Sequence, residues 1–159
     1  MAAQPLIIGK FWFSPHMPDE VLELAKELFL PLEWMIPAWC EEVRVFWDAE
    51  GFDNDRESKD NSASAYMTAS YSYRFARIAL CPVFLSQEDE ERRLTVRHEM
   101  GHVILSPFAD YVREAFDTLA GDNEIVRKLV ETEIRERYEA VTEDLAKTFQ
   151  RGCNAGQIA

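Results

Sequence analysis

The chain has 159 residues, of which 47% are hydrophobic and 12% aromatic, and it carries 29 acidic against 17 basic residues. This length and hydrophobic content exclude a disordered chain and predict a single domain over residues 1–159, with its core over about 18–150. The net charge of −12 argues against nucleic acid or an anionic membrane as the main partner, because both are bound through basic surfaces.

The three cysteines, Cys40, Cys81 and Cys153, lie far apart and form no C-x-x-C pair. They therefore predict neither a disulfide framework nor a cysteine metal site, and apolar neighbours predict that the first two are buried thiols. The start of the chain lacks the basic residues and long apolar run of a signal peptide, and no segment reaches the ~20 apolar residues that span a bilayer. We therefore expect a soluble cytoplasmic protein.

The first part of the chain is predicted to hold one helix between two strands. Residues 6–13 are apolar and aromatic, as in a short strand. Apolar positions at helical spacing predict a helix over 19–29, and Pro31 follows its end. The segment 34–39 is predicted to be a buried loop or a short helical turn. Apolar residues alternate with Arg44 in the next predicted strand, which ends at Trp47.

The middle of the chain is predicted to hold a polar loop and two further strands. Residues 49–61 are acidic and rich in turn formers, which predicts an exposed loop. Asp53 and Asp55 in this loop lack the spacing and the terminal Glu of a calcium-binding loop. Strands are predicted over 64–70 and 75–80. Together with the strand before the loop, they make a small mixed sheet of about three strands.

Helices are predicted to fill the rest of the chain. Ser86 offers an N-cap for a helix that the pair Ser106-Pro107 ends. A second helix is predicted over 108–119, and one long helix or two short ones over 124–150. The order of helix, strands and then helices predicts the α+β class.

The sequence His98-Glu99-Met100-Gly101-His102 lies inside the first of these helices. Residues four apart lie on one face of a helix, so the two imidazoles can bind one ion together. Glu99 lies about 100° further around the helix, beside such an ion rather than on it. Two His ligands, a neighbouring carboxylate and a bound water form the core of a zinc hydrolase. We therefore predict zinc as the cofactor and Glu99 as the general base.

A catalytic zinc needs a third protein ligand. No His follows His102, and His16 lies upstream beside two prolines, where a surface role is the commoner one. We favour Glu139, on the flank of the apolar stripe of the last helix, where small neighbours allow another element to approach. Glu143, one turn later, is predicted to hydrogen-bond a ligating His, or to be the ligand itself. Glu131 is a weaker third choice.

These residues predict the hydrolysis of a peptide or protein bond. Zinc lowers the pKa of its bound water, Glu99 accepts the proton, and the hydroxide attacks a polarised carbonyl. Glu99 then returns the proton to the leaving amine. The strand over 75–80 is a candidate edge for pairing with an extended peptide. The candidate oxyanion donors are Tyr73, Arg97, Tyr111 and Tyr138.

Three features of the chain are typical of one family. They are the strand sequence Arg77-Ile78-Ala79-Leu80, the pentad at 98–102 with Pro107 after it, and Glu139 followed by Leu145-Ala146. On these features, over residues 39–150, the chain resembles the minimal zincins of the gluzincin type found in phages and prophages. It also resembles the short metallopeptidases of mobile elements that cleave repressors.

The resemblance implies a zincin-like α+β fold, with the sheet packed on the H-E-x-x-H helix and on a long C-terminal helix. It implies that His98, His102 and Glu139 bind zinc and that Glu99 is the catalytic base of a metallopeptidase. The substrate would be a protein or peptide, in the host cytoplasm if the protein is phage-encoded. The alternatives are a non-enzymatic binding or structural protein that keeps a zincin fold, and a helical interaction protein whose pentad is accidental.

Overall fold

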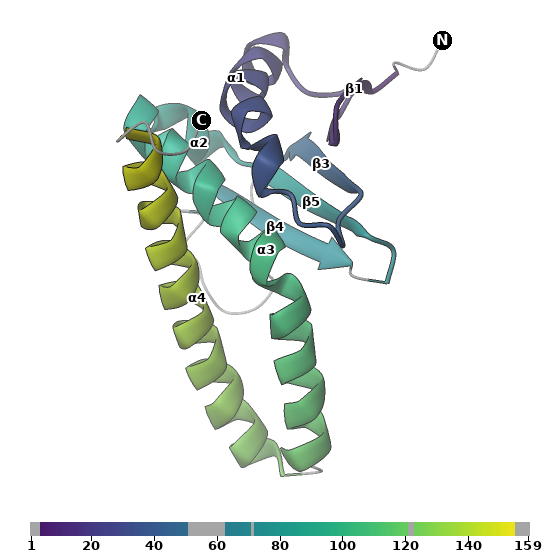
Figure 1. Ribbon diagram of the computed structural model, residues 1–159, viewed down its shortest axis with the longest axis vertical. Helices are drawn as coiled ribbons and strands as arrows, with labels where there is room; N and C mark the ends of the chain where they lie inside the picture. The colour runs from purple at the N-terminus through teal and green to yellow at the C-terminus, as the bar shows by residue number, and fades with distance from the viewer. Residues whose placement is uncertain (1–3, 51–62, 71, 121–122, 155–159) are drawn as a thin grey trace.

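The computed structural model describes residues 4–50, 63–70, 72–120 and 123–154. It is a mixed α+β structure in which the helices lie against one face of a five-stranded sheet (Figure 1). The strands are β1 (Leu6–Ile8), β2 (Phe11–Phe13), β3 (Glu42–Trp47), β4 (Ala65–Ser70) and β5 (Phe75–Leu80). The helices are α1 (Asp19–Phe29), the 3-10 helix η1 (Leu30–Met35), α2 (Pro82–Ser86), α3 (Asp89–Ala120) and α4 (Glu124–Asn154).

The sheet has the strand order β1-β2-β3-β5-β4. The central strands β2, β3 and β5 are parallel, with Val45 of β3 opposite Ile78 of β5, whereas β1 and β4 are antiparallel edge strands. A parallel pair needs a crossover, and α1 supplies it between β2 and β3. The sheet therefore holds the three strands predicted for its middle, and two more from the N-terminal segment.

The N-terminal segment forms a hairpin and not the single strand predicted over 6–13. Gly9 turns the chain between the two strands with a φ of 57°, a conformation that L side chains rarely adopt. A Cβ at this position would also clash with the carboxylate of the Glu33 side chain. The turn therefore requires glycine, and it converts one apolar run into two paired strands.

The hydrophobic core lies between the sheet, α1 and α3. Side chains alternate along a strand, so each strand gives every second residue to this core. The helices contribute positions three or four apart, as the amphipathic pattern predicted for α1. The buried thiols of Cys40 and Cys81 confirm a prediction from the sequence. Buried core residues include Val43, Val45, Ala76, Ile78 and Leu80 of the sheet, Val21, Ala25 and Leu28 of α1, and Val96, Met100 and Val103 of α3.

α3 is one helix of 32 residues, so the prediction that Ser106-Pro107 ends it is wrong. Proline lacks an N–H and crowds the carbonyl four residues earlier, which breaks a helix or bends it. Here the helix continues to Ala120 on the other side of Pro107, and Figure 1 shows α3 changing direction part-way along its length. The antiparallel α4 packs beside α3 (Figure 1), and this packing stabilises the continuation.

α3 begins at Asp89, and the N-cap predicted at Ser86 is also wrong. Ser86 is the last residue of α2, and its hydroxyl donates to the Val83 carbonyl oxygen at 2.7 Å. The Glu88 N–H instead donates to Oε2 of Glu91 at 3.2 Å, which is the reciprocal half of a capping box. The helix start therefore lies two residues later than the Ser-x-x-Asp pattern indicated.

α4 is a single helix, one of the two options that the sequence allowed. Its C-terminal half packs against the first half of α3, where Thr142 and Ala146 are fully buried. The far ends of both helices project beyond the sheet (Figure 1). None of the helices in the described ranges is long and apolar enough to cross a membrane. Most of the loop predicted over 49–61, with Asp53 and Asp55, lies outside the described residues.

Candidate metal centre

α3 presents the pentad to two sides of the helix. Met100 and Val103 are fully buried in the core beneath the sheet. His98 and His102 are four residues apart and so share one helix face, which meets α4. Met100, midway between them, points to another side of the helix. The apolar member of the pentad thus anchors the helix, and this holds the two imidazoles toward α4.

Gly101 lets α4 come close at the level of the two histidines. A Cβ at this position would lie 3.0 Å from Cγ2 of Thr142, tighter than nearly all real contacts of this kind. Glycine inside a helix costs about 1 kcal/mol relative to alanine, so the close approach accounts for an otherwise unfavourable residue. It also brings side chains of α4 within reach of both imidazoles.

Three ligand atoms converge in the space between the two helices. Nε2 of His98 and Nε2 of His102 lie 3.0 Å apart. Oε2 of Glu139 lies 3.3 Å from Nε2 of His98 and 3.4 Å from Nε2 of His102. Each of these three residues can offer one ligand atom, and the three atoms all lie within 4.8 Å of one another. The structure therefore brings together the three residues predicted to bind metal.

The outer nitrogen of each imidazole has its own partner. Nδ1 of His98 lies 3.2 Å from Oε2 of Glu143, the residue predicted for this outer role. Nδ1 of His102 lies 3.3 Å from the hydroxyl of Thr142, which donates its own proton to the Tyr138 carbonyl oxygen at 2.9 Å. Both partners thus accept from Nδ1–H, which places the proton on Nδ1 and leaves the Nε2 lone pair free.

Two imidazole lone pairs and a carboxylate oxygen therefore face one another. Three acceptors at this range repel unless a proton or a cation lies between them. Ligand atoms about 2.0–2.2 Å from a tetrahedral zinc lie about 3.3–3.6 Å apart, close to the separations within this cluster. Two nitrogens and one carboxylate oxygen also form the donor set of a catalytic zinc site, with a fourth position left for water. The cluster fits such an ion.

Electrostatics couple Glu139 to both histidines. When an imidazole is protonated on both nitrogens, its Nε2–H donates to Glu139, and these hydrogen bonds from His102 and His98 lower the pKa of Glu139 to about 2, against a smaller opposing effect of burial. The hydrogen bond to Glu139 in turn raises the pKa of His98, partly opposed by burial. Lys147, 3.0 Å from Oε1 of Glu143, is the main cause of the lowered pKa of that carboxyl group. Both acidic residues thus favour the carboxylate form that a metal site needs.

Glu99 differs from both, since it is only 6% exposed. Burial raises its pKa to about 7, and the two imidazoles only partly offset this rise. Its Oε2 has no hydrogen-bond partner among the described residues. A buried, unpartnered carboxyl group beside a metal cluster can accept and release a proton near neutral pH.

A hollow of about 300 Å³ opens beside the cluster. It lies between α3, α4 and the start of β4. The residues that line it are Ala63, Ser64, Ala65, Leu94, Thr95, His98, Glu99 and Glu143. The prediction that the strand over 75–80 is a free edge is wrong, because β5 pairs with β3 on one side and β4 on the other. The edge strand next to the hollow is β4.

Of the four candidate oxyanion donors, only Tyr138 contacts the cluster. Its ring stacks on the His102 ring with the two ring centres 5.1 Å apart, and its hydroxyl donates to the His102 carbonyl oxygen at 3.2 Å. Tyr73 and Tyr111 are 79% and 68% exposed, in the turn before β5 and in the projecting part of α3. Arg97 is buried and donates to the Arg93 carbonyl oxygen at 3.1 Å.

The structure does not bring the other predicted ligands into this group. The group of possible metal ligands found among the described residues contains neither His16 nor Glu131. Thr142 is the site residue that sequence reasoning missed. The available signal was its position, three residues after Glu139 and on the side of α4 that meets Gly101.

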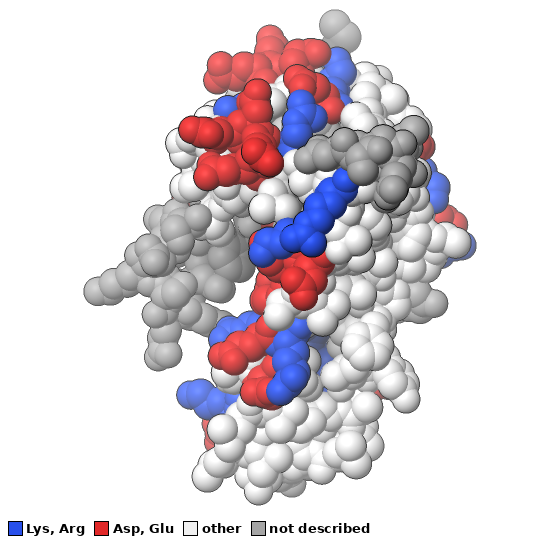
Figure 2. All heavy atoms as spheres, turned by 60° about the vertical axis from the view of Figure 1, so that its left-hand side comes forward, with Lys and Arg blue, Asp and Glu red and all other residues white. Residues whose placement is uncertain are grey.

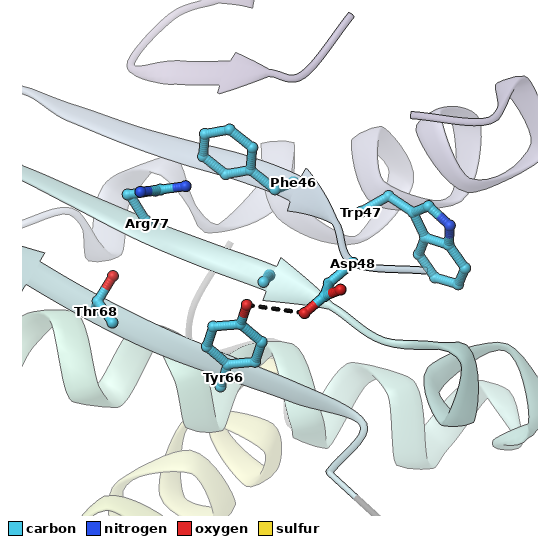
Figure 3. Close-up of a pocket in the computed structure, with 7 residues that line it drawn as sticks. Phe46, Trp47, Asp48, Tyr66, Thr68 and Arg77 are labelled. Carbon is cyan, nitrogen blue, oxygen red and sulfur yellow. Dashed lines mark hydrogen bonds between the residues drawn. The ribbon is translucent and has the colours of Figure 1, made fainter. Parts of the chain in front are cut away.

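A second and larger hollow, of about 410 Å³, opens on the sheet (Figure 3). Tyr66 donates to Oδ2 of Asp48 at 3.0 Å there, and the guanidinium of Arg77 lies 4.5 Å from the ring centre of Phe46. Its lining contains one carboxylate and no histidine, so it lacks the donor set of a zinc site. The residues that could hold a metal therefore lie at the smaller hollow beside α3.

Comparisons with known proteins provide no further guide. The sequence matches no protein-family model, and neither a curated protein nor a solved structure was found to be similar to it.

Proposed function

We propose that this protein is a zinc-dependent peptidase with a zincin-like fold, and that His98, His102 and Glu139 hold the ion. One observation carries the proposal. Two Nε2 atoms and a carboxylate oxygen converge at 3.0–3.4 Å, while both Nδ1 atoms are occupied by acceptors. A metal ion satisfies all three inward-facing lone pairs at once.

Glu99 is the general base in this proposal. A zinc ion supplies a water of lowered pKa and a positive charge that polarises a carbonyl. The raised pKa of Glu99, about 7, suits a group that accepts a proton from water and later delivers it to a leaving amine. Glu99 lines the hollow together with His98, so a substrate carbonyl seated there can reach both.

The substrate is a protein or peptide segment in extended form. β4 is an edge strand whose outer side has no partner strand among the described residues, and its first residue, Ala65, lines the hollow. An edge strand offers main-chain N–H and carbonyl groups to an added strand. A peptide paired with β4 would pass over Glu99 and His98.

The first test measures the metal. Protein purified without added chelator should contain about one zinc per chain, because a site of this donor set binds zinc tightly. Inductively coupled plasma mass spectrometry measures this content. His98→Ala should lose it. Equal zinc content in the wild type and His98→Ala would exclude the proposed site.

The second test measures hydrolysis. The wild type and Glu99→Gln are incubated with a peptide library, and cleavage products are read by mass spectrometry. Glu99→Gln should keep its zinc and lose cleavage by about a thousandfold or more, because it cannot accept a proton. Zinc in both proteins with no Glu99-dependent cleavage would instead favour a non-enzymatic metal-binding protein.

A further inference from the structure

The exposed large apolar side chains of this protein are concentrated in the projecting part of α3 and α4. We call residues 108–120 and 123–129 of this part the hairpin tip. Six of the twelve exposed large hydrophobic residues in the described ranges belong to it. These six are Phe108, Tyr111, Leu119, Ile125, Val126 and Leu129, with exposed fractions of 63, 68, 85, 75, 41 and 67%.

The α3 part of this set continues the core stripe of the same helix. The stripe runs through Met100, Ile104, Phe108, Tyr111, Ala115 and Leu119, at spacings of four, four, three, four and four. Such spacing keeps all six on one side of a helix. Met100 is fully buried and Ile104 packs against the core, whereas Phe108 and the following large residues are exposed. The apolar stripe thus extends further than the layer that covers it.

Four of the charged residues of the hairpin tip form ion pairs with one another. Asp110 lies 3.5 Å from Arg113, and Asp117 lies 3.8 Å from Arg127 across the two helices. Figure 2 shows a band of adjacent acidic and basic side chains and, below it at the lower end of the molecule, a largely uncharged surface. A partner of this surface therefore needs apolar side chains and not a complementary net charge.

We propose that the hairpin tip binds a second copy of this chain and closes a four-helix bundle. Two antiparallel helices bury one side of each helix against each other and need another layer for a second apolar side. A second copy supplies an equal stripe through a two-fold axis. The six side chains expose on the order of several hundred Å² per chain, near the roughly 800 Å² per partner of a stable interface.

Charge and position both permit a second copy. Residues 105–138 carry eight acidic and five basic residues, a net charge of −3 per hairpin, and salt screens the repulsion between two such surfaces at physiological ionic strength. The hairpin tip also lies beyond Tyr138 and the metal cluster, so this pairing leaves the hollow at Glu99 open. The inference is independent of the proposed peptidase activity.

The test is sedimentation velocity over roughly 1–200 µM protein, a range that brackets weak and moderate dimers. The wild type should shift from monomer to dimer with concentration. Phe108→Glu and Leu119→Glu should each raise the dimer Kd at least about tenfold, because each places a charge in an apolar interface. The matched control is Ile7→Glu, at an exposed apolar residue of β1 (61% exposed), which should leave the Kd within twofold.

Circular dichroism of each variant reports whether it folds. Both substitutions lie at exposed positions, so both variants should keep the fold. A wild type that is monomeric throughout overturns the proposal, as does a dimer unaffected by both substitutions. Binding of the monomer to phosphatidylcholine vesicles that is lost in Phe108→Glu would assign the stripe to a lipid surface and would also overturn it.

Discussion

The two halves of the α3–α4 hairpin differ in the kind of side chain that each holds in an unusual environment. In the half that packs on the core, polar and titratable groups are gathered between the helices, and each outer imidazole nitrogen has a partner. In the projecting half, apolar side chains face outward. Buried polar groups and exposed apolar groups both cost stability in isolation. On the two proposals made above, one pair of helices holds two sites with different kinds of partner, a cation and an apolar surface.

Removing metal should produce the largest difference in stability between the two halves of the hairpin. A ligand at about 1,000 times its Kd adds about 4 kcal/mol to the free energy of unfolding, roughly 10 °C in Tm for a chain of this size. EDTA should therefore lower Tm by this amount and speed amide exchange around residues 95–103 and 138–146. Exchange in the hairpin tip should not change.

Glu139→Ala is the control for metal removal, since a variant without the third ligand should lose little further stability in EDTA. Equal loss of protection in both halves of the hairpin would contradict the assignment of the metal to the core-packed half.

Gly101→Val should destabilise the core-packed half by about 2 kcal/mol, measured by urea unfolding. The added side chain would overlap Thr142, and overpacking of this kind typically costs 1–3 kcal/mol. Ala140→Val, at an exposed position of α4, should cost only about 0.5 kcal/mol in helix propensity. Similar costs at both positions would show that the helices do not approach closely at Gly101.

Thr142→Val should weaken zinc binding roughly tenfold to a hundredfold while the fold is kept. Valine matches threonine in shape but cannot accept the Nδ1–H of His102. Competition with a chromophoric chelator measures the affinity, and Thr142→Ser should restore most of it. An affinity equal to that of the wild type would remove Thr142 from the site.

Pro107→Ala should have the smallest effect, a gain of about 1 kcal/mol in the free energy of unfolding. Pro107 lies between the two halves, and alanine restores a main-chain N–H that proline lacks. Thermal unfolding followed at 222 nm measures the change. A loss of stability would show that the bend at Pro107 is required for the packing of α3 on α4.

Periodicity and turn chemistry predicted most of the individual elements. α1 has the predicted bounds, and the strands β3, β4 and β5 differ from prediction by a residue at most. These elements are short and strongly patterned, so local sequence decides them. The errors at Pro107 and Ser86 have one cause. A proline can end a helix or only bend it, and a serine can cap a helix start or bond to an earlier carbonyl, and the packing of neighbouring helices decides which occurs.

The pentad by itself determined which residues share a helix face, because a spacing of four is a local property of any α-helix. The carboxylate of Glu139 reaches that face only because α4 packs against α3, which brings it to histidines more than 30 residues earlier in the sequence. Tertiary packing likewise decided that β4 is the strand at the hollow, that burial raises the pKa of Glu99 to about 7, and that the stripe from Phe108 onward is left uncovered. Backbone geometry acts over a few residues, whereas desolvation and exposure depend on every element packed nearby.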